Sequence, residues 1–322
     1  MQVLFCFGIE KRRIMYYNIQ KVSKGVFMKL YAPRYYKKFK CIADKCDHSC
    51  CIGWEIDIDE DTLEKYKAPE VPYASEILNS ISFEGAPHFK LCEGDRCPHL
   101  NENGLCKIIL RAGEGYLCGI CREHPRFYNY TDVAEVGLGM SCREAARLIL
   151  SSPDYDVTEE IGQTPYGEET CFFDGRSERE KIYKILGDKS ADYSAKLQTL
   201  YSSFKIDAVD DAVWRGIINS LEYLEEKHKE LFLNYSSQSR PQGMDEYLER
   251  ALAYFIYRHC TEAYDEEEFR LRLNFCLFCE RLLASLIYSQ KAGTLQEIAV
   301  LASIISEEIE YSEDNTQALT WR

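Results

Sequence analysis

The chain has 322 residues, of which 46% are hydrophobic and 13% aromatic, so it is long enough for two domains and a substantial buried core. Its formal net charge of −14 excludes an extended nucleic-acid surface as the main function, because such a surface needs clustered Lys and Arg. No apolar run reaches the roughly 18 residues that a membrane span requires. The opening residues also lack the order of a secretory signal. We therefore expect a cytoplasmic protein that binds neither nucleic acid nor membrane, and its oligomeric state stays open.

The first 27 residues raise the question of where translation begins. The codons for residues 24–28 can read as a bacterial ribosome-binding sequence followed by a start codon at Met28. We therefore expect residues 1–27 to be an upstream extension, with a short N-terminal arm as the alternative.

Cysteine content divides the chain. Ten of the fifteen cysteines lie between Cys41 and Cys142. We expect a cysteine-rich, metal-organised α+β domain at residues 28–150, a polar linker at 151–174 and a helical domain at 175–322. The predicted fold class is mainly α, with a short hairpin in the first domain and a helical bundle in the second.

Two local patterns shape the first part of the cysteine-rich segment. Residues 56–67 (IDIDEDTLEKYK) predict a short extended piece followed by a helix capped by acids. The Asn103-Gly104 step predicts a tight turn, which would bring Cys97 and Cys106 together.

The remaining elements follow from hydrophobic spacing. Residues 126–141 alternate aromatic and polar side chains around Thr131-Asp132, which predicts a hairpin, and residues 143–152 predict a helix that Pro153 ends. Beyond residue 175, apolar residues recur at three- and four-residue spacing, as in a helical bundle. The helices we predict there cover 210–232, 244–259, 266–290 and 294–311.

The cysteine spacing is typical of metal thiolate sites. Short spacings supply pairs of sulfurs and longer loops bring the pairs together, and disulfides are rarely kept in a reducing compartment. Spacing does not choose between zinc and an iron-sulfur cluster. The expected ligands are Cys41, Cys46, Cys50, Cys51, Cys97, Cys106, Cys118, Cys121 and Cys142.

Other cysteines and three histidines need separate interpretations. His48, His99 and His124 lie among the cysteines, where each either replaces a thiolate or donates a hydrogen bond to a sulfur. We expect Cys276 and Cys279, three residues apart on a predicted helix, to pack in the core.

Three stretches carry a family likeness: LYAPRYYKKFKCIADKCDHSCCIGWEIDID, CPHLNENGLCKIILRAGEGYLCGICREHPRFYNY and GLGMSC. Together they resemble the flagellin lysine-N-methylase family, within a broader group that has a CxxCxxCC zinc- or iron-chelating signature. The resemblance implies methyl transfer from S-adenosylmethionine to lysine side chains of flagellin, in a protein with an iron-sulfur cluster, [4Fe-4S] in type, or zinc. The first spacing here, Cys41-x4-Cys46-x3-Cys50-Cys51, is looser than the signature, so the ligand assignment stays open. Compared with the family that this chain resembles, its C-terminus is short, so one expectation is a truncated and less active member.

Candidate catalytic and binding residues surround the first cysteine cluster. Glu55, Asp57 and Asp59 would share one side of an extended strand and could attract a cationic lysine; the alternative is a row of solvated acids. Trp54 could hold a cation against its ring or simply cover a metal loop. Arg126 could pair with a carboxylate of the cofactor, although we favour its neutralising a thiolate site.

Neither a glycine-rich cofactor turn nor a Cys-x3-Cys-x2-Cys radical motif is present, so the S-adenosylmethionine pocket is not located. We favour a structural or positioning metal site with polar displacement chemistry. The alternative function is a non-catalytic zinc- or iron-binding or carrier protein with a helical domain that binds a partner.

Overall fold

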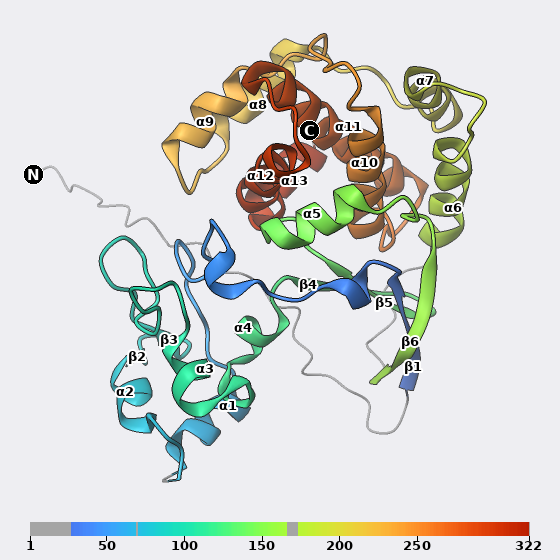
Figure 1. Cartoon of the computed structure of the whole chain (residues 1–322). Helices are drawn as coiled ribbons and strands as arrows, with labels where there is room; N and C mark the ends of the chain where they lie inside the picture. The colour runs from blue at the N-terminus through green and yellow to red at the C-terminus, as the bar shows by residue number, and fades with distance from the viewer. Residues whose placement is uncertain (1–26, 69, 166–172, 322) are drawn as a thin grey trace, which may run out of the picture. The chain divides into compact units, whose positions relative to one another are not determined.

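The computed structural model describes residues 27–68, 70–165 and 173–321, which form a mainly helical protein with a small mixed sheet (Figure 1). The described chain divides into a cysteine unit, residues 42–124, and a helical unit, residues 27–41 with 125–321. In the structure, residues 125–150 therefore belong to the helical unit. From the distribution of cysteines we expected them in the cysteine-rich domain. The proposed upstream extension at residues 1–27, Cys6 and Cys171 lie outside the described residues, except for Phe27.

The cysteine unit consists of short elements joined by loops. The extended piece and helix predicted at residues 56–67 are confirmed: Ile56 and Ile58 are buried, and the Asp59 side chain accepts the N–H of Thr62 to cap the helix. The elements are α1 (Glu60–Lys67), α2 (Ala74–Asn79), α3 (Lys107–Ala112), α4 (Gly119–Glu123), β2 (Ile81–Ser82), β3 (His88–Phe89), η2 (Ala43–Lys45) and η3 (Glu114–Tyr116).

A four-stranded sheet lies in the helical unit, in the order β4-β5-β1-β6. The predicted hairpin is confirmed by the antiparallel pair β4 (Arg126–Tyr130) and β5 (Ala134–Leu138). Strand β1 (Phe27–Pro33) runs parallel to β5 and antiparallel to β6 (Thr158–Pro165). The sequence did not predict β1 or β6, and β6 occupies part of the expected linker. No residue of β6 is fully buried, so this strand carries no clear alternation of apolar residues.

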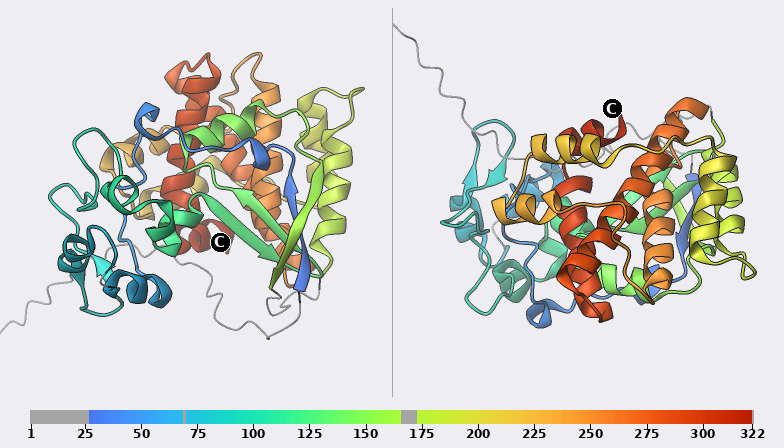
Figure 2. Two further views of the ribbon diagram at one scale, coloured as in Figure 1. Left: turned by 60° about the horizontal axis from the view of Figure 1, so that its bottom comes forward. Right: turned by 90° about the horizontal axis from the view of Figure 1, so that it is seen from above.

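Helices form most of the helical unit, and α10, α11 and α12 are its central elements (Figure 2). Helix α10 packs on the sheet, where Tyr257 donates its hydroxyl hydrogen to Val136 O and accepts from Asn129 Nδ2 through its carbonyl oxygen. None of the described helices combines the length and apolarity that a bilayer crossing requires. The elements are η1 (Tyr36–Lys38), α5 (Arg143–Ser151), α6 (Gly175–Leu186), α7 (Tyr193–Ser203), α8 (Asp211–Ser220), α9 (Glu226–Leu233), α10 (Asp245–His259), α11 (Glu266–Gln290), α12 (Leu295–Ile305), the π-helical turn η4 (Ser306–Glu310) and α13 (Glu313–Thr320).

Most of the predicted helices are confirmed, but the segment 210–232 is interrupted between α8 and α9. The N–H groups of Leu224 and Glu225 donate to the buried Glu308 carboxylate, at 2.8 and 3.2 Å, instead of to carbonyl groups one turn earlier. The N–H of Glu222 donates to the Asn315 side chain at 3.0 Å. Tertiary hydrogen bonds therefore override a helical pattern in the sequence.

Candidate metal centre

The first two cysteine loops of the cysteine unit are joined by their backbones. The N–H of Cys97 donates to the carbonyl of Cys51 at 2.8 Å, and the N–H of Gly53 donates to the carbonyl of Asp95 at 3.0 Å. Gly53 adopts a φ of +86°, which a residue with a side chain rarely adopts. A glycine two residues after the adjacent cysteines lets the chain turn back onto the second loop.

The turn predicted between Cys97 and Cys106 is confirmed. Asn101 Oδ1 accepts the N–H of Asn103 at 2.9 Å, and Gly104 has a φ of +74°. Burial is the main cause of the raised pKa of Cys97, and negative charge on the sulfur of Cys106, at the other end of the turn, raises it further. The Asn-Gly turn therefore gathers two of the expected ligands.

The third cysteine pair begins helix α4 and is tied to α1 by Asp59. Asp59 Oδ2 accepts the N–H of Gly119 at 2.6 Å and the hydroxyl of Thr62 at 2.9 Å. Partial burial raises the pKa of Asp59, but the hydrogen bonds from Gly119 and Thr62 outweigh it and hold that pKa below its usual value. The structure thus gives this candidate catalytic acid a connecting role between a helix start and the Cys118–Cys121 loop.

Six thiols of these loops lie close enough to shift one another's pKa, and all six are among the nine expected ligands. Negative charge on Cys97 and Cys106 contributes to the raised pKa of Cys51. Negative charge on Cys51 and Cys97 likewise contributes to the raised pKa of Cys121. The six are Cys50, Cys51, Cys97, Cys106, Cys118 and Cys121, and we call them the thiol cluster.

The thiol cluster has the donor chemistry of a metal site. The sulfur of Cys97 accepts backbone N–H groups from His99 and Leu100, and that of Cys106 from Ile108 and Ile109, a pattern that stabilises thiolates. No three His, Cys, Asp or Glu side chains of the described residues already stand in coordination geometry. The residues present fit a thiolate-bound metal only by the chemistry of their donor atoms, and the loops would have to move to close the site.

Hydrogen bonds and burial divide the cluster into thiols with a lowered pKa and thiols with a raised pKa. The Cys118 and Cys121 sulfurs lie 3.5 Å apart; their hydrogen bond lowers the pKa of Cys118 and raises that of Cys121. A bond from Cys51 likewise lowers the pKa of Cys50 to about 7. Burial raises the pKa of Cys97 to about 11. Several thiolates at one point would repel one another, and a bound cation relieves that repulsion.

Three further expected ligands remain, Cys41, Cys46 and Cys142. Cys46 lies in the cysteine unit and is half-buried, whereas Cys41 and Cys142 belong to the helical unit. Cys142 precedes the first residue of α5 and packs against the helical core. Their role as ligands stays a prediction.

The remaining candidate residues occupy different settings. Trp54 is buried, and Glu55 and Asp57 are half-buried, as expected for an extended piece with one side in the core. Arg126 belongs to the helical unit, where its Nε donates to the Tyr36 hydroxyl at 2.9 Å and its guanidinium lies over the ring of Phe39. Binding roles for these residues stay predictions.

Sequence reasoning missed a buried charged network in the helical unit. Glu310 lies 2.6 Å from His259 Nε2, accepts the Tyr254 hydroxyl at 2.9 Å and pairs with Arg258 at 3.5 Å. Burial raises the pKa of Glu310, but Arg258 and His259 outweigh it and lower that pKa to about 2. The available signal was the acidic run SEEIE, which interrupts an otherwise apolar helix and forms a π-helical turn.

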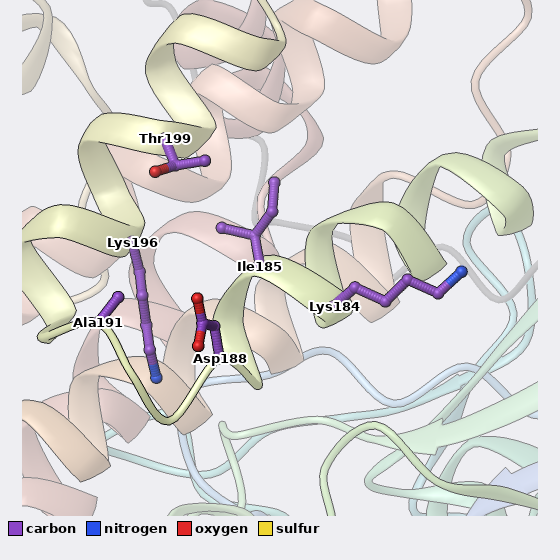
Figure 3. A pocket seen from close by; sticks show the side chains of 6 residues that line it. All are labelled: Lys184, Ile185, Asp188, Ala191, Lys196 and Thr199. Carbon is purple, nitrogen blue, oxygen red and sulfur yellow. The ribbon is translucent and has the colours of Figure 1, made fainter.

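A small surface hollow lies between α6 and α7 (Figure 3). Its volume is about 220 Å³, below the roughly 300–1,000 Å³ of typical ligand pockets. Lys196 at its wall is paired with Glu249 at 2.8 Å, and Lys184 points away from the other lining side chains. We assign this hollow no ligand.

The fold and the thiol cluster define a cysteine-rich protein with a candidate metal centre in one unit and a second unit that is mainly helical. Over 130 residues, 38% of this chain, the sequence is homologous to known proteins at 28% identity. These are the flagellar biosynthetic protein FliU of Salmonella muenchen and the lysine-N-methylases of Salmonella typhimurium and Salmonella choleraesuis. The resemblance to the lysine-N-methylase family is therefore confirmed.

The extent of the match differs between these relatives. The matched stretch spans 77% of FliU but 32% of each lysine-N-methylase. No family model matches the chain, and no solved structure matches it. The homology thus covers part of this chain and about a third of the methylases.

Proposed function

We propose that this protein transfers methyl groups from S-adenosylmethionine to lysine side chains of flagellin. We also propose that a metal held by the thiol cluster organises the cysteine unit for this reaction. The observation that carries the proposal is the homology to two proteins named lysine-N-methylase and to a flagellar biosynthetic protein. Motifs of the same family run from residue 30 to Cys142 and include all six thiols of the cluster.

The thiol cluster would hold the metal. Cys97, Cys106, Cys118 and Cys121 come from a turn and a helix start that hydrogen bonds already fix in place, and Cys50 and Cys51 come from the joined first loop. Zinc would make this a closed structural site, whereas a [4Fe-4S] cluster would add a redox group. A lysine nitrogen is a sufficient nucleophile to attack a sulfonium methyl group, so the reaction needs no redox group. We therefore favour a metal that positions the surrounding residues.

Methyl transfer to lysine requires a neutral amine, whereas the free side chain has a pKa of about 10.4. The enzyme must therefore attract the ammonium group and then remove its proton through a nearby base or by desolvation. In the cysteine unit, Glu55 and Asp57 are half-buried acids on either side of the buried Ile56. They remain the better candidates for attracting the cation, because Asp59 is committed to Thr62 and Gly119.

The test is an assay with purified, metal-loaded protein, recombinant flagellin and S-adenosylmethionine labelled in its methyl group. We expect methyl groups on flagellin lysines by mass spectrometry. A variant with both Cys118→Ser and Cys121→Ser should lose metal and activity, whereas Cys92→Ser, at an exposed cysteine of the same unit outside the thiol cluster, should retain both. Wild-type protein that binds metal but neither binds S-adenosylmethionine nor methylates flagellin would overturn the enzymatic proposal.

The alternative is a non-catalytic metal-binding protein whose helical unit binds a partner. It is favoured by one observation: the matched stretch makes up 77% of FliU, named only as a flagellar biosynthetic protein, but 32% of the methylases. Capture of flagellin by the metal-loaded protein, without methylation, would support this alternative.

A further inference from the structure

His99 occupies an unusual position for a histidine in the cysteine unit. Its side chain is about 1% exposed and lies edge-on to the rings of Phe89 and Tyr73, with centroids 4.7 and 5.6 Å away. It follows Cys97 by two residues, within the turn that carries two thiols of the cluster. A buried imidazole in such a place needs partners for both ring nitrogens.

Hydrogen bonds identify which ring nitrogen carries the proton. Nε2 lies 2.9 Å from Ser80 Oγ, and Ser80 donates its single hydroxyl hydrogen to the carbonyl of Ile77 at 2.6 Å. Ser80 can therefore only accept from His99, so Nε2 is the protonated nitrogen. Nδ1 is left with an available lone pair.

Nδ1 is buried and has no hydrogen-bond partner among the described residues. An unsatisfied buried acceptor costs about 1–3 kcal/mol, so its retention calls for an explanation. The same arrangement, in which one imidazole nitrogen donates to an outer partner and the other is bare, is how proteins orient histidines that bind metals.

The backbone places His99 beside two thiols of the cluster. The N–H of His99 donates to the sulfur of Cys97, and its carbonyl accepts the N–H of Lys107, the residue after Cys106, at 2.7 Å. The ring of Tyr73 contacts His99, and negative charge on Cys97 and Cys106 contributes to the raised pKa of the Tyr73 hydroxyl. The backbone of His99 is thus anchored between the two cysteines of the turn.

We propose that His99 Nδ1 is a ligand of the metal held by the thiol cluster, so that the site combines imidazole with thiolates. A neutral imidazole in place of a fourth thiolate lowers the negative charge of a zinc-type site by one, which reduces the cost of holding the site in a partly buried unit. The inference rests on the metal-binding part of the proposed function and is independent of methyl transfer.

Cobalt binding to the full-length protein tests this proposal. Co²⁺ takes the place of zinc, and its visible ligand-field bands and near-ultraviolet sulfur-to-cobalt bands report nitrogen and sulfur ligands separately. His99→Ala should weaken Co²⁺ binding by about 100-fold, the upper end of effects seen even for outer partners of metal ligands. It should also shift the ligand-field bands while the sulfur bands persist. His99→Cys should restore binding and strengthen the sulfur bands.

Two controls make the result specific. His88→Ala removes another histidine of the same unit, one that bonds to the Ala86 carbonyl instead, and should leave affinity and spectrum unchanged. Ser80→Ala removes the hydroxyl that holds the proton on Nε2, and should weaken binding by about tenfold with little spectral change.

Cadmium NMR of wild-type protein labelled with nitrogen-15 at histidine gives a test that needs no variant. Coupling between bound cadmium and one imidazole is expected. His99→Ala with wild-type affinity and spectrum, or cadmium without coupling to nitrogen, overturns the assignment and leaves a thiolate-only site. Wild-type protein that binds neither ion overturns the metal site itself, a result distinct from absent methylation.

Discussion

The cysteine unit and the helical unit stabilise themselves in different ways. Among the described residues, the core of the cysteine unit contains 11 buried hydrophobic residues, two of them thiols of the cluster, whereas the core of the helical unit contains 47. Burial of apolar area is the main stabilising contribution to folding, so the cysteine unit has far less of it. Small units of this kind usually depend on metals or disulfides, and no disulfide joins two of the 13 described cysteines.

Cysteine itself behaves differently in the two units. In the helical unit, Cys260, Cys276 and Cys279 are fully buried, as expected for small hydrophobic residues, which confirms the predicted core packing of the last two. In the cysteine unit, Cys106 and Cys118 directly precede helices, where backbone N–H groups point at sulfur. Sulfur therefore serves packing in one unit and presents ligand atoms in the other.

Removal of the metal should give the largest difference between the two units. Treatment of the metal-loaded protein with a chelator should unfold the cysteine unit, because the free energy of metal binding to a structural site is also free energy of folding, about 10–16 kcal/mol for zinc-finger peptides. Hydrogen exchange with peptide resolution should show lost protection in α1 and α3 and retained protection in α10 and α11. Equal loss of protection in both units would contradict the contrast.

The helical unit should respond most to loss of one partner in its buried ion pair. Arg179 donates to both carboxylate oxygens of Glu135, at 2.6 and 2.8 Å, and to the Thr261 hydroxyl at 2.7 Å. Arg179→Met should destabilise this unit by about 3–5 kcal/mol, because the buried Glu135 carboxylate keeps only its longer contact with Arg176, at 3.7 Å. Chemical denaturation measures this loss.

The double variant Glu135→Met with Arg179→Met is the matched control. Because it removes both charges, most of the lost stability should return. If the double variant is as unstable as Arg179→Met, packing rather than unpaired charge is responsible.

A pH dependence should also belong to the helical unit. Burial raises the pKa of Glu307 to about 8, only partly opposed by Arg143 and reinforced by Glu308. Between about 4.5 and about 8, the unfolded chain releases this proton while the folded chain keeps it, so stability falls as pH rises. Glu307→Gln should remove that decline, which at about 1.4 kcal/mol per pKa unit amounts to at most roughly 5 kcal/mol.

Denaturation curves across this pH range test the Glu307 prediction. As a control, Glu226→Gln, at an exposed acid in the first turn of α9, should keep the wild-type profile. Parallel pH profiles for wild-type protein and Glu307→Gln would show that Glu307 is ionised in the folded protein.

Local patterns predicted the elements that short-range physics determines. The Asn103-Gly104 turn, the helix after Asp59 and the hairpin at Thr131 all depend on neighbouring residues, and all are present. The edge strand β6 and the break before α9 depend on distant partners, Glu308 in the second case, so no local pattern revealed them. For the site, spacing predicted clustered thiols but could not show which loops meet, because that depends on long-range bonds such as the one from Gly119 to Asp59.

The smallest expected effect concerns this bond between Asp59 and Gly119. Asp59→Ala removes both the cap of α1 and the acceptor for Gly119, and should cost the cysteine unit about 1–2 kcal/mol. It should also weaken metal binding by about tenfold, because the Cys118–Cys121 loop loses its anchor. Titration with Co²⁺ measures the second effect, which loss of a helix cap alone would not produce.

Two variants separate these effects of Asp59. Asp59→Asn keeps a side-chain oxygen that accepts an N–H group, so it should recover part of both the stability and the metal affinity. Asp61→Ala changes an exposed acid in the first turn of the same helix and should leave metal affinity unchanged. Were Asp59→Ala to lose stability but bind Co²⁺ like the wild type, Asp59 would be only a helix cap, and the third cysteine loop would be positioned by the metal itself.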